Sequence, residues 1–165
     1  MNIHDNKLMG TYVVFAAGTG IIPFIDLITF ALRYMVHTIS VKHFKYNNNL
    51  LLKNEEATFK DIVHPSFKIH LFVTFSNPES AIYMNVFQEL EKLDQKYNLN
   101  VFKLTTRYSS EKTERWNKSF IKNNLYQTRN SINKIYLIGP VPFMEDINVG
   151  LIETGVSDKK RIIFV

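Results

Sequence analysis

Short apolar runs alternate along the chain with longer segments of helical periodicity. Residues 12–17 form a β-rich run, and in residues 67–75 most apolar side chains fall on every second position. Residues 24–36 are apolar nearly all round, which is typical of a helix buried on more than one side. The pattern therefore predicts a strand, a helix and a second strand in the first half of the chain.

The same alternation continues in the second half of the chain. Asn77-Pro78 is expected to begin a helix, as its N-cap and its first helical residue. An amphipathic helix is predicted there by apolar residues at steps of four, four, three and four: Ile82, Val86, Leu90, Leu93 and Tyr97. The later elements are expected to be a strand at 99–106, a short helix at 118–125, a strand at 134–138, a helix at 142–154 closed by Gly155, and a strand at 161–165.

Strands that alternate with helices pair in parallel through right-handed crossovers. We therefore expect an α/β fold, a three-layer sandwich around a five-stranded parallel sheet. Residues 38–65 fit no element of this pattern and are expected to be an insertion or a surface excursion. The 165 residues amount to one domain, 1–165, at the usual domain size of about 150 residues.

Composition narrows the class of protein. Hydrophobic residues make up 45% of the chain and charged residues 21%, which is ordinary for a globular protein with a core. The absence of cysteine excludes disulfides and thiolate metal sites, and favours a reducing compartment. Residues 1–10 carry no apolar core of a signal peptide, and Gly18, Pro23 and Arg33 interrupt the apolar region 11–39. We expect an intracellular, cytoplasmic location.

The net charge is +5, and it is unevenly distributed. Residues 101–134 hold eight basic residues against Glu111 and Glu114. Three interpretations of this stretch stay open: a solvated face, attraction of an anionic cofactor, or docking of an acidic partner. Nucleic acid is not expected as a partner, because the aromatic residues of this stretch match no recognised binding motif: Tyr108, Trp116, Phe120 and Tyr126.

Two glycine turns carry the candidate chemistry. Gly18-Thr19-Gly20 follows the first predicted strand, and Gly139-Pro140 follows the fourth. Glycines before a helix start suit a phosphate group, because the backbone approaches closely and free N–H groups face the anion. On spacing alone, a tight strand-to-helix turn explains the first motif equally well. The turns at 18–23, 76–79 and 139–143 are expected together at the carboxyl edge of the sheet, where such folds bind ligands.

Other nucleotide and catalytic motifs are missing. Pro23 stands where the dinucleotide fingerprint requires its third glycine, and no Walker loop is present. The five histidines show no metal-ligand spacing, and no serine is flanked by glycines in an elbow. Kinase, GTPase, hydrolase and metalloenzyme functions are therefore excluded, and no metal site is expected.

The two turns resemble those of a known family. Residues 16–24, AAGTGIIPF, are similar to the first strand and helix of the pyridine-nucleotide domain of the ferredoxin reductase superfamily. Residues 138–144, IGPVPFM, followed by a helix, Gly155 and Phe164, are similar to its closing motif. The resemblance covers nearly the whole chain and points to the cytochrome b5 reductase branch, including fusions with a cytochrome b5 domain. It implies a module that binds NADH or NADPH and delivers hydride to FAD.

The resemblance also implies roles for single residues. Residues 18–20 would bind the pyrophosphate, Thr106 and Arg107 would lie near the adenosine ribose, and Gly139-Pro140 would flank the nicotinamide. From the residues alone, Thr106 and Arg107 equally well end a strand, with Arg107 paired to Glu111. The implied cofactor-binding residues are Gly18, Thr19, Gly20, Ile21, Pro23, Ser76, Asn77, Thr106, Arg107, Gly139, Pro140, Val141, Pro142 and Phe143.

Two departures from the family bear on whether this chain takes part in hydride transfer. Ile138 stands at the position that is usually a cysteine beside the nicotinamide, and it is the one candidate catalytic residue. An alternative function is therefore a non-catalytic interaction or regulatory domain that keeps the fold without hydride transfer.

The second departure is that the family's flavin-binding barrel is not in these 165 residues. The implied partners are an upstream FAD-binding domain and a cytochrome b5 domain or other acidic electron acceptor. The module alone is expected to be monomeric and inactive, and association of the parent protein with the endoplasmic reticulum membrane is open.

Overall fold

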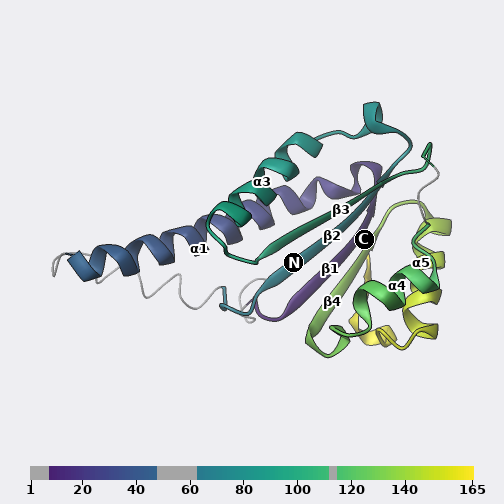
Figure 1. Ribbon diagram of the computed structural model, residues 1–165. Helices are drawn as coiled ribbons and strands as arrows, with labels where there is room; N and C mark the ends of the chain where they lie inside the picture. Colours follow the sequence, from purple (N-terminus) through teal and green to yellow (C-terminus); the bar gives the residue numbers. More distant parts are fainter. Residues whose placement is uncertain (1–7, 48–62, 112–114) are drawn as a thin grey trace.

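Five parallel strands form one sheet in the order β3-β2-β1-β4-β5 (Figure 1). The computed structural model describes residues 8–47, 63–111 and 115–165, without the side chains of 39–47. The strands are β1 (Thr11–Ala17), β2 (Lys68–Phe75), β3 (Phe102–Tyr108), β4 (Ile132–Ile138) and β5 (Ile162–Phe164). The predicted fold class, an α/β sandwich around a five-stranded parallel sheet, is confirmed.

Helices cover both faces of this sheet (Figure 1). The helices α1 (Pro23–Asn47) and α3 (Met84–Lys96) pack on one face, and α4 (Lys118–Leu125) and α5 (Val141–Glu153) pack on the other. Four short 3-10 helices join these elements: η1 (Gly18–Ile21), η2 (Pro78–Ser80), η3 (Arg129–Ser131) and η4 (Lys159–Arg161). The order is therefore three layers, with the sheet in the middle.

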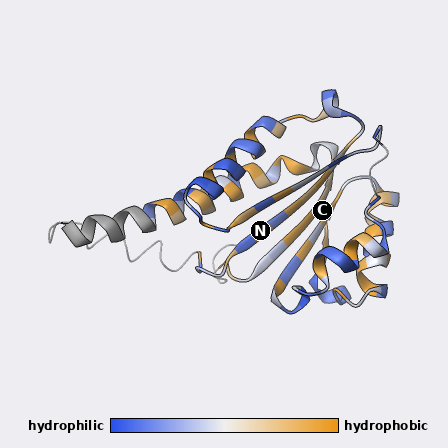
Figure 2. Ribbon diagram, viewed as in Figure 1, coloured by the Kyte–Doolittle hydropathy of each residue, from blue (hydrophilic) through white to orange (hydrophobic). Residues whose placement is uncertain are grey.

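Each face of the sheet has its own apolar core, because successive strand residues point to opposite faces. Under α1 and α3 the core includes the fully buried Leu32, Phe67 and Phe87. Under α4 and α5 it includes a ring cluster in which Phe15 lies 4.8 Å from Phe72 between centroids. Figure 2 shows orange and blue bands alternating along the covering helices, as expected for elements with one face on a core.

The first helix is longer than the sequence pattern predicts. A helix at 24–36 is expected, but α1 runs from Pro23 to Asn47. The predicted excursion at 38–65 is therefore helical over its first ten residues, because residues 37–47 contain neither glycine nor proline to stop the helix. Residues 48–62 of the excursion lie outside the described residues, and Val63 pairs with Leu8 beside the sheet.

The inner side of α1 packs on the sheet. By length and composition, Gly18–Thr38 would be enough to cross a membrane, with a mean hydropathy of 1.5. Ile28 and Leu32, however, are fully buried against the strands, while Asp26 and Arg33 are exposed on the outer side. Only 28% of this apolar stretch is buried, so α1 packs on the core along one side and is less buried than the apolar pattern predicts.

The predicted start of the second helix is wrong by several residues. Asn77 caps η2 instead, in a reciprocal capping box with Ser80. The chain then passes through Tyr83 with a positive φ of 58°, and α3 begins only at Met84. The predicted apolar seam is correspondingly displaced: Met84 and Phe87 are buried, whereas the seam's two ends, Ile82 and Tyr97, are exposed.

The third strand begins three residues later than predicted. Asn98 and Asn100 have φ of 50° and 56°, so the chain turns through this stretch and β3 starts at Phe102. The first N–H groups on the outer edge of β3 are bound by acidic side chains of α3. Asp94, buried in the fold, accepts hydrogen bonds from the N–H groups of Val101 (2.8 Å) and Phe102 (3.1 Å).

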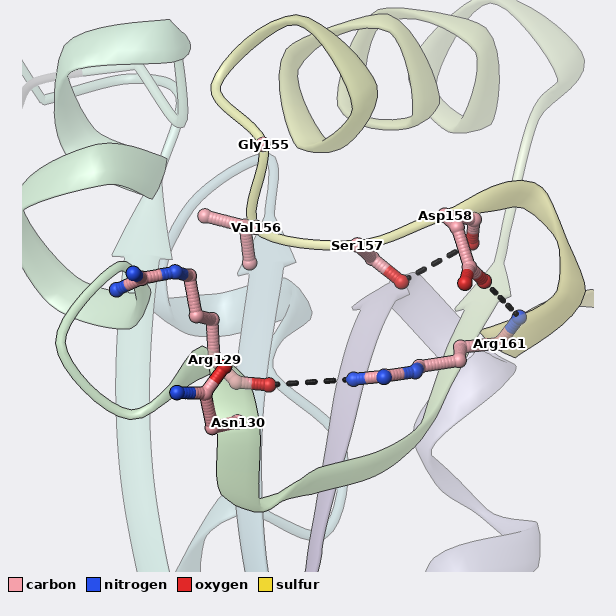
Figure 3. A pocket seen from close by; sticks show the side chains of 7 residues that line it. All are labelled: Arg129, Asn130, Gly155, Val156, Ser157, Asp158 and Arg161. Carbon is pink, nitrogen blue, oxygen red and sulfur yellow. Dashed lines mark hydrogen bonds between the residues drawn. The ribbon is translucent and has the colours of Figure 1, made fainter.

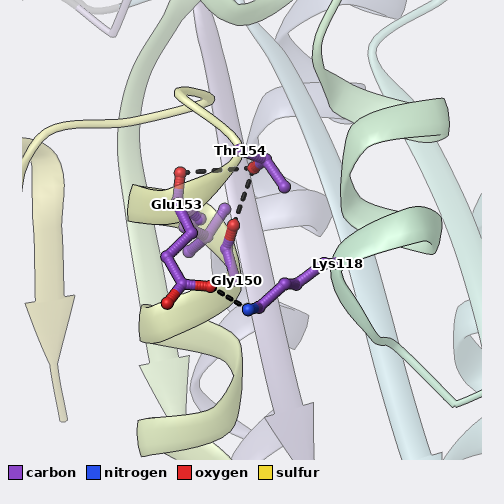
Figure 4. A network of polar contacts seen from close by, with 5 residues as sticks. Lys118, Gly150, Glu153 and Thr154 are labelled. Atoms are coloured by element: carbon purple, nitrogen blue, oxygen red, sulfur yellow. Dashed lines mark hydrogen bonds and ion pairs between the residues drawn. The ribbon is translucent and has the colours of Figure 1, made fainter.

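Helices α4 and α5 approach each other closely on the other face. A Cβ added at Gly150 of α5 would lie 2.6 Å from Cδ1 of Ile121 on α4. An ion pair between Lys118 and Glu153 spans the two helices, and Thr154 Oγ1 donates to the carbonyl of Gly150 at 2.7 Å (Figure 4). Both charged groups are about half exposed or more, so the glycine contact rather than the ion pair sets the helix spacing.

Candidate functional site

The two glycine turns lie together at the carboxyl edge of the sheet. β1 is paired with β2 on one side and β4 on the other, so the strand order reverses between β1 and β4. Both turns line one open pocket of about 610 Å³ at this edge. Its lining residues are Ala17, Gly18, Thr19, Gly20, Thr74, Phe75, Ser76, Ser80, Ser109, Ile138, Gly139 and Pro140. This is the place at which open parallel sheets bind ligands.

Close packing between the turns requires glycine at two of these positions. A Cβ on Gly20 would lie 2.6 Å from Cγ2 of Ile138. Gly139 has a φ of 150°, and a Cβ there would lie 2.8 Å from Cβ of Ala17. The backbones of the β1 and β4 turns therefore approach more closely than any larger residue would allow.

Ile138 lies between the two turns. It is the last residue of β4 and is 8% exposed, and its side chain packs over Gly20 while lining the pocket. The β-branched side chain has a stiff χ1. Ile138 therefore gives the pocket a fixed apolar wall where the two turns meet.

Hydroxyl groups form much of the remaining wall. Ser80 Oγ donates to the Asn77 carbonyl at 2.9 Å, and Ser109 Oγ donates to the Phe75 carbonyl at 3.1 Å. Thr19, Thr74 and Ser76 add further polar groups to the lining. In the part of the chain that the structure describes, no charged side chain lines this pocket, so its polarity comes from hydroxyl and backbone groups.

Seven of the predicted site residues line the pocket: Gly18, Thr19, Gly20, Ser76, Ile138, Gly139 and Pro140. The others lie outside its lining. Ile21 is fully buried in the core under α1, Pro23 begins α1, and Asn77 caps η2. Val141 and Pro142 are exposed on the first turn of α5. Phe143 packs toward Trp116, with ring centroids 6.1 Å apart.

Thr106 and Arg107 occupy opposite faces of β3. Thr106 is in register with the core residue Val73, and Arg107 is in register with Thr74, which lines the pocket. Arg107 Nε is buried without a hydrogen-bond partner, and among the described residues Arg107 makes no ion pair. Thr106 and Arg107 thus lie at the end of β3, as the alternative expects, but the ion pair of Arg107 with Glu111 is absent from the described residues.

Five lining residues are missing from the sequence-based set: Ala17, Thr74, Phe75, Ser80 and Ser109. Thr74 and Phe75 are the last residues of β2 and immediately precede the predicted Ser76, so their place at the strand end could have identified them. Ser109 was hidden because the strand prediction ended at 106, whereas β3 runs to Tyr108. Ser80 enters through η2, which the expected continuous helix concealed.

Several solved structures have a similar fold. The chain superposes on the cytochrome b5 reductase domain of Ulva prolifera nitrate reductase with a TM-score of 0.61 and 14% identity, covering 98% of this chain and 54% of that one. Flavohemoglobin from Malassezia yamatoensis with bound FAD and heme gives 0.60 and 14%, covering 98% and 32%. Ferredoxin-NADP+ reductase from Plasmodium falciparum with 2'P-AMP gives 0.54 and 18%, covering 99% and 52%.

These likenesses concern the fold, since identities below 20% accompany nearly complete coverage of this chain. The chain spans about a third to a half of the proteins it matches. No protein-family model and no curated protein matches the sequence. The strand order, the two glycine turns and these superpositions agree: the chain has the fold of a ferredoxin reductase-like NAD(P)-binding domain.

Proposed function

We propose that the chain is the NAD(P)H-binding module of a flavin-dependent oxidoreductase, in which hydride passes from the nicotinamide to FAD held by another domain. The observation that carries the proposal is the single pocket lined by both glycine turns at the switch point of the sheet. Flavohemoglobin and ferredoxin-NADP+ reductase, which share the fold, are solved with FAD and with 2'P-AMP respectively.

The backbone around Gly18 fits a diphosphate. Gly18 has a φ of 57°, and a Cβ built on it would meet no atom within 4 Å, so the turn leaves open space inside the pocket lining. The N–H groups of a first helical turn have no intrahelical partners and attract anions. In this proposal Gly18, Thr19 and Gly20 hold the pyrophosphate through the backbone, without a cationic side chain.

The remaining lining residues orient the two ends of the cofactor. Gly139-Pro140 and Ile138 provide the close, apolar surface for a nicotinamide ring, and they exclude water from one of its faces. In this proposal the hydroxyls of Ser76, Ser80 and Ser109, which also belong to the lining, would bind the ribose hydroxyls of the adenosine. Arg107, beside Thr74, is the nearest candidate to attract a 2′-phosphate, so NADH and NADPH both belong in the test.

Calorimetric titration with NADH, NADPH and adenosine nucleotides tests the proposal, using a matched pair of variants. Gly18→Ala places a methyl group in the pocket. Gly10→Ala places one at a φ of 73° outside both pockets, so both variants carry a backbone strain of about 1 kcal/mol. We expect the first variant to weaken nucleotide binding severalfold and the second to leave it unchanged. Absence of saturable binding by the unmodified chain contradicts the proposal.

The alternative, a non-catalytic regulatory or interaction domain, rests on Ile138, because the resemblance implies a smaller cysteine at this position beside the nicotinamide. Fusing a flavin-binding barrel ahead of residue 1 and following NAD(P)H oxidation with an artificial electron acceptor separates the two functions. Turnover by the fusion removes the alternative. If the fusion binds nucleotide without turnover, and Ile138→Cys restores turnover, the result favours the non-catalytic alternative.

A further inference from the structure

A second pocket lies at the opposite, amino-terminal edge of the sheet. The segment around η3, which leads into β4, forms one wall, and the segment from α5 to β5 forms the other (Figure 3). The pocket has a volume of about 290 Å³, and its lining residues are Arg129, Asn130, Gly155, Val156, Ser157, Asp158 and Arg161. We propose that this pocket binds a phosphate group, independently of the nucleotide pocket at the carboxyl edge.

Arg161 is held in place by neutral groups. Its Nη1 donates to the carbonyl oxygens of Arg129 (3.3 Å) and Ile132 (3.2 Å), both of which belong to the chain leading into β4. Figure 3 shows the Arg161 side chain reaching across the pocket toward the Arg129 carbonyl. A guanidinium group carries five N–H donors. Nη1 accounts for two of them, so the Nε and Nη2 donors have no partner among the described residues.

These remaining donors match an oxyanion. Nε and Nη2 lie on one edge of the planar guanidinium, and an arginine edge binds two oxygens of a phosphate or carboxylate in parallel. Because the Arg161 side chain is already fixed by its Nη1 bonds, an anion that binds here orders little further structure.

Arg129 adds a second fixed cation. Its Nη1 donates to the Tyr126 carbonyl at 2.7 Å, and its guanidinium carbon lies 3.9 Å from the centroid of the Tyr126 ring. Neither arginine forms an ion pair within the described ranges. Asp158 also lines the pocket, and its Oδ1 accepts hydrogen bonds from the backbone N–H groups of Lys160 (3.0 Å) and Arg161 (3.2 Å).

The charge and size of the pocket favour a phosphate dianion. The lining residues carry two positive charges, on Arg129 and Arg161, and one negative charge, on Asp158, and Lys159 and Lys160 add two positive charges on the adjoining η4. A concave pocket of this volume admits one phosphate group, whereas a nucleic-acid backbone requires an extended basic groove. Free phosphate and the phosphate of a small monoester share this chemistry.

The test is an NMR titration of the chain with inorganic phosphate and, separately, glycerol 1-phosphate at constant ionic strength. We expect saturable shifts of the amides of residues 156–161 and of Asn130. Arg161→Gln should weaken binding roughly tenfold, because it removes a charge-assisted bidentate contact. The matched control Lys160→Gln removes a neighbouring charge outside the lining and should weaken binding by less than about twofold.

Three outcomes overturn the proposal. An absence of saturable shifts, or an equal loss in Lys160→Gln and Arg161→Gln, would show only diffuse attraction to a basic surface. Shifts confined to residues 18–20 and 139–140 would place phosphate in the nucleotide pocket instead. If Arg161→Gln does not fold, Arg129→Gln takes its place, and the residues whose amides shift in the unmodified chain show which pocket binds phosphate. Tighter binding of the monoester than of free phosphate would identify the monoester as the source.

Discussion

Ile138 and Gly20 form the tightest contact in the candidate site. With 2.6 Å between a built Cβ at Gly20 and Ile138 Cγ2, an alanine at position 20 forces one of the two turns to move. We expect Gly20→Ala to destabilise the fold by about 1–3 kcal/mol, the usual cost of overpacking. In the Ile138→Ala background, which lacks Cγ2, the added cost should fall by about 1 kcal/mol or more.

Urea unfolding of the two single variants and the double variant measures this coupling. Gly150→Ala is the control, because its built Cβ meets Ile121 on the far helices and shares no contact with Ile138. Strict additivity between Gly20→Ala and Ile138→Ala would show that the contact between the turns carries no energy.

His70 gives the fold a pH dependence. Burial on β2 is the largest cause that lowers its pKa, to about 4 from the usual 6.5, and the charges of Lys103 and Lys68 lower it further. Because the folded-state pKa lies below the unfolded one, the unfolded chain binds the proton more readily. The contribution of His70 to the free energy of unfolding is therefore fully present above pH 6.5 and is lost as the pH falls toward 4.

We expect about 1–2 kcal/mol to be lost across this range, after allowance for solvent screening. Urea unfolding at several pH values should show this slope in the unmodified chain and in His64→Gln, a variant in the loop before β2. His70→Gln should flatten it. An unchanged slope in His70→Gln would assign the dependence to other groups.

At the scale of elements, α3 protects the outer edge of β3. Asp94 accepts from the N–H groups of Val101 and Phe102, and Glu91 accepts from the N–H of Leu104 at 3.0 Å. Exposed strand edges invite pairing with other chains, and covering or charging them is a common defence. Two acidic side chains of one helix thus satisfy the first outward N–H groups of this edge.

Asp94→Ala should destabilise the fold by about 2 kcal/mol or more, because it leaves two buried N–H groups unsatisfied. Glu91→Ala should cost about half as much, since only one partly buried N–H loses its partner. Urea unfolding measures both, and hydrogen exchange of the Phe102 amide should accelerate in Asp94→Ala. Equal stability of the two variants would contradict this account of the edge.

The sequence predicts most of these elements but few of their boundaries. Patterns of apolar residues and of glycine and proline located the five strands and the four described α-helices, but not the short 3-10 helices. They missed the end of α1, where no residue stops the helix before Asn47, and the start of α3, where Tyr83 adopts a left-handed backbone conformation. Asp94 went unnoticed because an acid in a helix normally faces water, and its partners Val101 and Phe102 lie outside the helix, beyond the turn that follows it.

At the scale of the whole molecule, the sheet carries two different pockets at its opposite edges. The sequence predicts the carboxyl-edge pocket, because both glycine motifs follow the strands between which the strand order reverses. The pocket of Arg129 and Arg161 does not, because two loops that are 32 residues apart meet there only after β4 and β5 pair.

The two pockets should respond differently to salt. No charged residue among those described lines the carboxyl-edge pocket, whereas Arg129, Arg161 and Asp158 line the other. Raising ionic strength from about 0.01 to 0.15 M shortens the Debye length from about 30 to 8 Å. We expect nucleotide affinity to change less than phosphate affinity over this range. Calorimetry of both ligands in the same buffers checks this, and a steeper loss for the nucleotide would contradict the assignment of the pockets.

Ile138 is also a position at which a reactive side chain can be introduced to probe the pocket. The chain has no cysteine, and Ile138 lines the pocket at the meeting point of the two turns. The Ile138→Cys protein therefore carries a single thiol within these 165 residues, at the place where occupancy matters. Its rate of alkylation by a maleimide reports directly how often this wall is open to small molecules, and protection by an added compound identifies an occupant without any assay of turnover.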